Sequence, residues 1–256
     1  MKDFITSRNN KAVKELSSLK EKKYRDERGT YIVEGFKMVR EAYAAGKKVA
    51  RLIGTEEGLE ELGKSCVNID LSEAIAVTED VLKYGSDCKT PQGVIAELKK
   101  EDFGKRKPEG VCALLDGISD PGNMGTIERT CAAVGVNDVY LLNCCDPYSP
   151  KAVRSSMSGV YSLRLHFITA DDLGEVFDGV KIISCDMNGK NVFGYAAAGD
   201  FCLAVGNEAN GLSEEVKKIS SEFVKLPMTD KIESLNAGVA FSVALYELTK
   251  GKAENN

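Results

Sequence analysis

Three short segments in the second half of the chain carry residue types that suit ligand binding. They read PGNMGTIERT at 121–130, VGNEANGLSEE at 205–215 and LPMTDKIESLNAGVA at 226–240. Each joins turn-forming residues to an apolar stretch and places a polar side chain in or beside the turn. Gly and Asn permit positive φ and close backbone approach, so such turns suit a loop that wraps a ligand. Their spacing does not match the glycine-rich loops that bind dinucleotides or nucleotide phosphates.

A few side chains in these segments are candidates for chemistry. Asn123 lies in the first turn, and Arg129 follows six residues later on a predicted helix. Glu208 lies in the second loop, where its carboxylate can accept hydrogen bonds from neighbouring donors. Ser234 is the expected N-cap of the last helix. Taken singly, each residue also fits an ordinary turn, a surface arginine or a solvated carboxylate.

The second half of the chain alternates short apolar strands with helices. Helices are predicted at Met124–Val134, Pro150–Met157 and Ser234–Leu248, and strands at Val111–Leu115, Val139–Leu142, Ser162–Ile168, Lys181–Cys185, Phe201–Val205 and Phe223–Leu226. Continuous apolar strands between helices favour a parallel sheet covered on both faces. Ligands bind such sheets at the carboxyl ends of the strands, where the three segments fall.

The first hundred residues form a separate alternating pattern. Helices are predicted at Asn9–Lys22 and Gly35–Ala45, and strands at Thr30–Glu34 and Val49–Gly54. The stretch KKEDFGKRKPEG at 99–110 is polar and contains Gly and Pro, which is typical of a linker. We therefore predict a domain at 1–100, a linker at 101–110 and a larger α/β domain at 111–256.

Composition excludes several function classes. The net charge is −5, but residues 1–50 hold thirteen Lys/Arg and seven Asp/Glu, a local excess of +6 that is compatible with phosphate binding. The eight cysteines form no CxxC pair, so reduced thiols are expected. His166 is the single histidine, which leaves few ligands for a zinc site and no second histidine for a Ser-His-Asp triad beside it. No metal is predicted. The charged N-terminus does not look like a secretory signal, and no apolar run approaches the roughly 18 residues of a membrane span, so we predict a cytoplasmic protein without membrane contact.

The three segments together resemble a known family. The order N-x-G-x-x-x-R, then GNE-x-x-G-L, then L-P-M and S-L-N is similar to motifs one to three of the SpoU (TrmH) family of RNA 2′-O-ribose methyltransferases, in the SPOUT superfamily. The stretch PKAVRSSMSGVYSL at 150–163 is similar to the family's segment after motif one. The N-terminus resembles the small RNA-substrate-binding domain of rRNA-modifying members.

The resemblance implies a fold, a cofactor and site residues. It implies an α/β fold with a C-terminal SPOUT domain, a trefoil-knotted parallel sheet, and a smaller N-terminal α/β domain of the kind found in certain ribosomal proteins. It further implies a homodimer that uses S-adenosylmethionine. By motif matching, the cofactor contacts are Gly206, Asn207, Leu226, Met228 and Leu235, and the catalytic residue Arg129 is supported by Asn123, Glu208, Ser234 and Asn236. Position 128 is Glu where the family often has an apolar residue, and a local pair with Arg129 or Lys231 is expected.

RNA recognition is expected to fall mainly to the N-terminal half. Candidate phosphate contacts are Arg8, Asn10, Lys11, Lys14, Lys22, Lys23 and Arg25, together with Arg154 from the second half. The resulting prediction is S-adenosylmethionine-dependent 2′-O-ribose methylation of RNA, with 23S rRNA as substrate. Two alternatives stay open: the same chemistry on tRNA, and a non-catalytic RNA-binding or ribosome-assembly protein on a methyltransferase fold.

Overall fold

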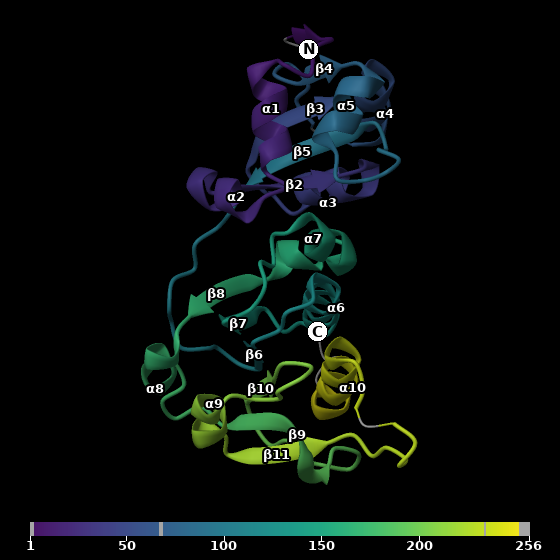
Figure 1. Ribbon diagram of the computed structural model, residues 1–256. Coiled ribbons are helices and arrows are strands. Elements are labelled where there is room, and N and C mark those ends of the chain that lie inside the picture. The colour runs from purple at the N-terminus through teal and green to yellow at the C-terminus, as the bar shows by residue number, and fades with distance from the viewer. Residues whose placement is uncertain (1–2, 67–68, 233, 251–256) are drawn as a thin grey trace. The chain divides into compact units, whose positions relative to one another are not determined.

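The computed structural model describes residues 3–66, 69–232 and 234–250, and the chain divides into two compact units (Figure 1). The first unit comprises Met1–Lys100 and Tyr148–Tyr161, and the second comprises Glu101–Pro147 and Ser162–Asn256. Both units combine a sheet with helices, in agreement with the predicted α/β class.

The first unit is built on a mixed five-stranded sheet in the order β1-β4-β3-β5-β2. β5 is antiparallel to β2 and β3, whereas β4 is parallel to β1 and β3. The predicted strands Thr30–Glu34 and Val49–Gly54 are confirmed. The elements are β1 (Asp3–Ile5), α1 (Lys11–Ser18), α2 (Lys22–Arg28), β2 (Thr30–Glu34), α3 (Phe36–Ala44), β3 (Val49–Gly54), α4 (Glu56–Ser65), β4 (Ile75–Val77), α5 (Glu79–Gly85) and β5 (Val94–Lys99).

The predicted helix at Asn9–Lys22 is shorter than expected. α1 ends at Ser18, and the N–H of its C-cap residue Leu19 turns back to the carbonyl of Leu16. A second helix, α2, begins at Lys22 and ends at Gly29, which adopts the left-handed conformation that favours glycine. The apolar residues Val13, Leu16 and Leu19 are buried, so the periodicity located the core face but not the break.

One segment from the second half of the sequence packs in the first unit. The ring of Tyr148 lies 4.7 Å from that of Tyr31, and the hydroxyl of Tyr161 donates to the carbonyl of Met38 at 3.1 Å. α7 (Pro150–Ser156) lies between these two contacts and also packs near β2. The observed units therefore differ from the predicted boundaries, which placed this segment with residues 111–256.

The second unit contains a six-stranded, all-parallel sheet in the order β11-β9-β10-β6-β7-β8. Its elements are β6 (Cys112–Asp116), α6 (Pro121–Ala133), β7 (Asp138–Leu142), β8 (Arg164–Ile168), η2 (Ala170–Asp172), α8 (Leu173–Val176), β9 (Ile182–Asn191), β10 (Cys202–Val205), α9 (Glu214–Ile219), β11 (Glu222–Lys225) and α10 (Ala237–Thr249), and the short helix η1 (Gly159–Ser162) precedes β8. β6 and β7 are buried along their whole length, as expected for central parallel strands. The predicted strands of this half are confirmed with shifts of one or two residues, except that the strand predicted at Lys181–Cys185 continues to Asn191 as β9. The knot that the resemblance implies stays a prediction.

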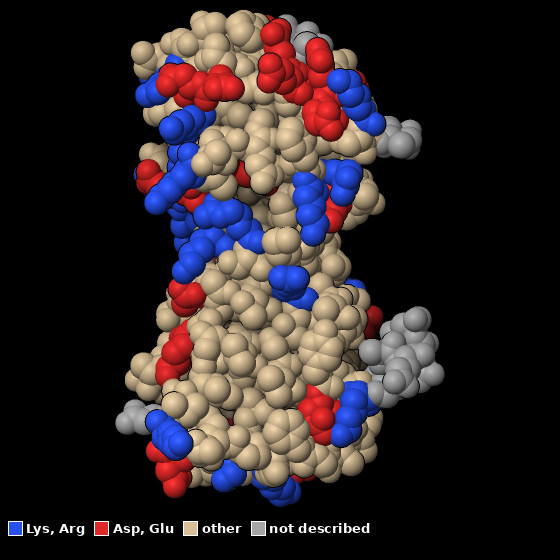
Figure 2. Space-filling view, turned by 90° about the vertical axis from the view of Figure 1, so that its right-hand side faces the viewer, with Lys and Arg blue, Asp and Glu red and all other residues tan. Residues whose placement is uncertain are grey.

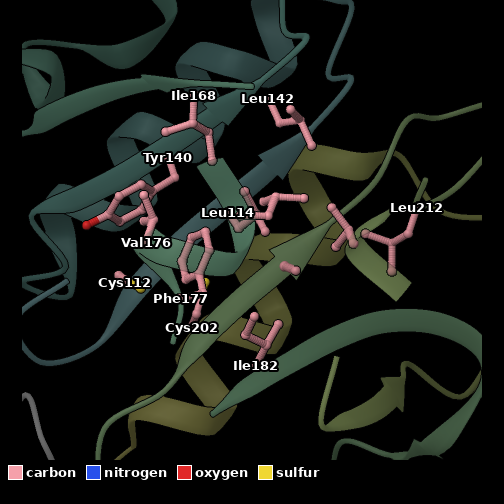
Figure 3. Close-up of a cluster of buried hydrophobic side chains, with 13 residues drawn as sticks. Cys112, Leu114, Tyr140, Leu142, Ile168, Val176, Phe177, Ile182, Cys202 and Leu212 are labelled. Carbon is pink, nitrogen blue, oxygen red and sulfur yellow. The ribbon is translucent and has the colours of Figure 1, made fainter. Parts of the chain in front are cut away.

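Helices cover both faces of this sheet. On one face, Leu114, Tyr140 and Cys202 pack with Phe177, next to α8, and with Leu212, just before α9 (Figure 3). α6 and α10 pack together on the other side (Figure 1). The three motif segments lie on the side of the sheet that α6 and α10 cover, at the adjacent strand ends.

His166 is a structural residue, as its place on an apolar strand suggested. The ring is fully buried and stacks on Tyr140 at 4.6 Å. Its Nε2 lies 2.9 Å from Asp138 Oδ1, and its Nδ1 lies 2.8 Å from the carbonyl oxygen of Gly104. Arg164 holds the same aspartate through two bonds of 2.7 and 2.6 Å, and these partners hold the pKa of Asp138 well below its usual range despite burial. The predicted linker is therefore fixed to the second unit at Gly104.

All eight cysteines are free thiols, in agreement with the reduced state predicted. Within the described part of the chain, no group of three or more Cys, His, Asp or Glu side chains is placed to hold a metal ion. Within the same residues, no helix has the length and apolar character needed to cross a bilayer.

Candidate active site

The three motif segments follow neighbouring strands at one edge of the parallel sheet. β10 pairs with β6 so that Val205 lies opposite Leu115, and the loops after these strands are therefore adjacent. β11 pairs with β9, the other neighbour of β10, which brings the third segment to the same edge. The topology thus gathers segments that begin at residues 121, 205 and 226 at the position where parallel sheets bind ligands.

A chain of three side chains joins the three motifs. The amide of Asn236 donates to Asn123 Oδ1 at 2.7 Å, and the amide of Asn123 donates to Glu208 Oε1 at 2.6 Å. The hydroxyl of Ser119 donates to the other carboxylate oxygen of Glu208 at 3.3 Å. Asn123 is buried, so its amide is held in one orientation by partners on both sides. The structure joins three of the four residues that the resemblance names as support for Arg129.

Helix capping places Asn123 at the start of α6. Asp120 is the N-cap, and its carboxylate accepts hydrogen bonds from the N–H groups of Gly122 and Asn123. Pro121 occupies the first turn, where its missing N–H has no cost. The helix consequently starts three residues earlier than predicted.

The second motif loop is anchored to the end of β6 at both of its ends. Asn207 donates its amide to the carbonyl of Gly117 at 2.7 Å and accepts hydrogen bonds from the N–H groups of Ala209 and Asn210. At the far end, the buried carboxylate of Asp116 accepts from the N–H of Ser213 at 2.6 Å. Asp116 was not among the predicted site residues.

Gly206 is required by packing within this loop. A Cβ built there would lie 2.2 Å from the carbonyl carbon of Gly211 and 2.4 Å from the nitrogen of Leu212. Both atoms belong to the backbone, so they cannot move aside without distorting the loop. The loop closes on itself at this point, where Asn207 and Gly211 exchange two backbone hydrogen bonds of 2.9 Å.

A cavity of about 630 Å³ opens between the second loop, the third segment and α10. All five predicted cofactor contacts line it, as does Ser234. Its walls combine small apolar side chains of α10 with polar groups of the loops. Among the described residues, the lining consists of Cys185, Asp186, Met187, Asn188, Val192, 205–211, Val224, Lys225, Leu226, Met228, Ser234, Leu235, Ala237, Ala240 and Ala244. This volume lies within the range of small-molecule sites, about 300–1,000 Å³.

The cavity suits a nucleoside-containing cofactor. Ala237, Ala240 and Ala244 leave room beside α10 for a flat, partly apolar ring. Asp186 and Asn188 at the end of β9 supply a carboxylate and an amide that can bind hydroxyl or ammonium groups. These two residues carry little signal of their own, because the sequence DMNGKN at 186–191 resembles an ordinary turn. Its position between two apolar stretches is the signal that could have identified them.

The last helix begins at Ala237, three residues later than predicted. Its N-cap is Asn236 rather than Ser234, and the Oδ1 of Asn236 accepts from the N–H of Val239 at 3.1 Å. Asn236 thereby caps α10 and binds Asn123 at the same time. Ser234 is exposed and remains at the rim of the cavity.

Arg129 is exposed on α6 and makes no hydrogen bond or ion pair with the residues that the structure describes. Its neighbour Glu128 is fully buried, and neither of its carboxylate oxygens has a hydrogen-bond partner among those residues. The expected pair of Glu128 with Arg129 or Lys231 is therefore wrong, because consecutive helical residues point in different directions. Burial, reinforced by the charge of Asp146, raises the pKa of Glu128 well above its ordinary value.

The candidate RNA contacts in the first unit differ in how their side chains are held. Lys11, Lys22 and Lys23 are exposed, and their ion pairs with the described residues are long i,i+4 pairs of 3.8–4.0 Å, so their charges remain accessible. Lys23 also lies over the ring of Tyr24, 5.6 Å from its centroid. Arg8 and Arg154 are engaged more closely, with Asp80 and Asp87 respectively.

Two of the other candidates have structural roles. Arg25 is buried, and its Nη1 donates to the carbonyls of Leu19 and Lys20 at 2.7 Å each. The prediction of a phosphate contact at Arg25 is therefore corrected, because this guanidinium satisfies the carbonyl groups at the end of α1. Asn10 is the N-cap of α1, where its Oδ1 accepts from the N–H of Ala12 at 2.8 Å.

Comparisons with known proteins agree with this geometry. Residues 110–246 match the model of the SpoU rRNA Methylase family, and residues 10–96 match an MRM3-like substrate binding domain. An uncharacterized tRNA/rRNA methyltransferase of Synechocystis is 31% identical over 95% of this chain and 92% of its own length. A 23S rRNA (uridine(2479)-2′-O)-methyltransferase of Streptomyces viridochromogenes is 29% identical over 96% of this chain and 91% of its own length.

One of the solved structures that this chain resembles contains a bound cofactor. The AdoMet-bound rRNA methyltransferase from Sinorhizobium meliloti superposes with a TM-score of 0.86 at 26% identity, covering 96% of this chain and 97% of that chain. The likeness extends over both units, and the fold is that of SPOUT methyltransferases with an N-terminal substrate-binding domain. Because the family model matches more than half of the chain, the protein belongs to the SpoU rRNA methylase family, with S-adenosylmethionine as its cofactor.

Proposed function

We propose that this chain methylates the 2′-hydroxyl of a ribose in 23S rRNA. The observation that carries the proposal is the pair of hydrogen bonds from Asn236 to Asn123 and from Asn123 to Glu208. These bonds link the three motifs beside the cofactor cavity. The Streptomyces relative, 29% identical, is named for this reaction on this RNA.

The cavity residues have separable tasks in this proposal. Gly206, Asn207, Leu226, Met228 and Leu235 hold the cofactor, which when bound supplies a methyl group on a positively charged sulfur. Asn123, Glu208 and Asn236 fix the first turn of α6 against that cavity. Holding the reacting groups in line supplies on the order of 7–11 kcal/mol of the barrier in well-oriented reactions.

Arg129 is the proposed catalytic residue. It lies on the same helix as Asn123, and its guanidinium is unengaged among the described residues. A guanidinium stays protonated throughout the accessible pH range, so it stabilises negative charge that develops on the ribose oxygen rather than accepting the proton. The hydroxyl proton then passes to another acceptor, for which an RNA phosphate is the proposed group.

The RNA is proposed to contact the first unit through the accessible cations Lys11, Lys22 and Lys23. Such contacts position the RNA without reading its sequence. The match of residues 10–96 to a substrate-binding domain supports this assignment.

Mapping of ribose methylation tests the proposed function. Mass spectrometry of rRNA and tRNA from cells with and without the protein should show one 2′-O-methyl group lost from 23S rRNA. A methyl group lost from tRNA instead would favour the alternative substrate. Calorimetry with S-adenosylmethionine separates an enzyme from a non-catalytic assembly protein, because the assembly protein would bind no cofactor. Cells that lack such an assembly protein would also keep every methylation in place.

We also propose that a second copy of the chain covers the outer face of α10. That face carries Val239, Val243 and Tyr246, which are all exposed. Figure 2 looks onto this side of the second unit and shows a broad area with few charged side chains. Exposed apolar areas of this kind mark interaction sites.

Light scattering tests the homodimer. The wild-type protein should have the mass of two chains, and Val243→Asp should have the mass of one, because the carboxylate would be buried in the interface. Phe167→Asp is the control, since Phe167 is also an exposed apolar residue, 53% against 37% for Val243, but lies on the edge strand β8, away from α10. A wild-type monomer at high concentration would refute the proposed partner.

A further inference from the structure

Tyr84 presents an aromatic ring on the surface of the first unit. It is the penultimate residue of α5, and it is 39% exposed. Three basic side chains lie near it. The guanidinium carbon of Arg8 is 5.9 Å from the ring centroid, the ammonium of Lys20 donates to the carbonyl of Tyr84 at 2.8 Å, and Lys83 is the preceding, exposed residue.

Arg8 is fixed beside the ring by an ion pair. Its Nε donates to Asp80 Oδ2 at 2.7 Å, and its Nη2 forms a second bond with the other carboxylate oxygen. Both partners are exposed, so this pair adds little to stability. Its structural effect is to hold the guanidinium plane next to Tyr84, because Asp80 and Tyr84 are one turn apart on the same helix.

This pairing changes the role predicted for Arg8. The carboxylate of Asp80 offsets the positive charge, so Arg8 is poorly suited to act as a simple phosphate contact. The guanidinium carbon lies over the Tyr84 ring at 5.9 Å from its centroid, and the ring is still 39% exposed, so it keeps surface on which a base can stack. Lys20 and Lys83 provide the local positive charge instead.

The helix that carries Tyr84 is firmly held. Val81 and Leu82 are buried in the core of the unit with Leu16 of α1. A Cβ built on Gly85 would lie 3.1 Å from Leu16 Cδ2, so glycine permits the close approach of α1 and α5. A ring on a rigid support loses little entropy when a ligand stacks on it.

We propose that Tyr84 and Arg8 form a stacking site for one unpaired base of the RNA substrate, with Lys20 and Lys83 beside the flanking phosphates. The site deepens the proposed function and rests on it, since it assumes an RNA substrate. Unpaired bases stack on aromatic rings and on guanidinium planes, and sequence-specific RNA recognition uses single-stranded regions in this way. A base in a duplex has no free face to offer.

Binding of the full-length protein to two probes tests the stacking site. The first probe is a short single-stranded RNA with one fluorescent 2-aminopurine, and the second is a blunt RNA duplex of equal length. Tyr84→Ala should bind the single strand about 5- to 100-fold more weakly and lose the fluorescence quenching that stacking causes. Tyr84→Phe should keep both, and duplex binding should be unchanged.

Phe4→Ala is the matched control. Phe4 is 55% exposed in the same unit, but its strand neighbour Ile5 points into the core under α5, so Phe4 points to the opposite face of the sheet. Single-strand binding by Tyr84→Ala equal to wild type would overturn the stacking site, as would an equal loss in Phe4→Ala or Tyr84→Phe.

Cofactor binding keeps the two proposals distinguishable. All variants should bind S-adenosylmethionine like the wild type, because Tyr84 does not line the cofactor cavity. Intact cofactor binding and methylation without any dependence on Tyr84 would refute the stacking site alone. RNA binding that depends on Tyr84 in a protein that methylates nothing would refute the proposed function and leave the stacking site.

Discussion

Asn123 donates a 2.6 Å hydrogen bond to the carboxylate of Glu208, a residue 85 positions away in another motif. The same side chain accepts from Asn236 at 2.7 Å, so its amide has one partner in each of the other two motifs. The direction of each bond is fixed by chemistry, since a carboxylate can only accept. This relationship makes the first turn of α6 depend on the loop that lines the cofactor cavity.

Asn123→Asp should disrupt that link selectively. The new carboxylate can still accept from Asn236, but it would face the carboxylate of Glu208 with no donor between them. We expect the free energy of unfolding to fall by about 1–3 kcal/mol and catalytic efficiency to fall about 5- to 150-fold. Thermal unfolding and methylation kinetics measure the two effects.

A second change should rescue this variant. With Glu208→Gln added to Asn123→Asp, the glutamine amide can donate to the new carboxylate and the bond is restored with its direction reversed. Stability and activity should recover in part in the double variant. Additive losses would mean that the bond between these two positions has no role in coupling the motifs.

Glu128 should make the protein less stable at alkaline pH. Burial raises the pKa of the Glu128 carboxyl in the folded state. The free energy of unfolding is therefore highest below the pKa of the unfolded carboxyl, about 4.3, and falls as the pH rises from there toward the pKa of the folded carboxyl. The loss is at most about 1.4 kcal/mol for each pH unit in that window. Glu128→Met should therefore unfold at a higher temperature than wild type at pH 8, with a smaller difference near pH 5.

The control for this prediction is Glu175→Gln. Glu175 is exposed on α8, and its replacement should leave the pH dependence of the unfolding temperature unchanged. If Glu128→Met and wild type showed parallel pH profiles, the carboxyl would be ionised in the folded protein and the predicted sign would be wrong.

Lys22 and Lys23 should contribute to RNA affinity through charge alone. Their ion pairs with Asp26 and Glu27 are long and exposed, so the ammonium groups remain free to meet phosphates. Replacing both with Gln should reduce the slope of log K against log salt by about 0.7 per lysine for single-stranded RNA. Lys217→Gln on α9 of the second unit should not change the slope. An unchanged slope in the double variant would leave both lysines as ordinary solvated residues.

Much of the candidate site was predictable because the fold places motif residues at one sheet edge. Asn123, Glu208 and Asn236 were identified by motif matching, and the parallel order of β6 and β10 explains why they meet. Asp186 and Asn188 were missed because the bulged end of β9 that carries them has no local sequence signal.

Other errors arose because the charge of a side chain does not reveal its burial. Arg25 and Glu128 read as surface residues, yet one binds backbone carbonyls inside the first unit and the other is enclosed without a partner.

Arg129 provides the most direct test of the proposed chemistry. If its role is to stabilise negative charge on the ribose oxygen, Arg129→Lys should keep part of the activity, because an ammonium also carries that charge but lacks the planar fork of donors. Arg129→Ala should lose about 100- to 1,000-fold in kcat, the usual effect of removing one charge-stabilising donor. Both variants should bind S-adenosylmethionine like the wild type, since Arg129 does not line the cavity. Equal and complete loss of activity in Lys and Ala variants, with cofactor binding intact, would contradict a charge role and would favour a function that requires the guanidinium itself.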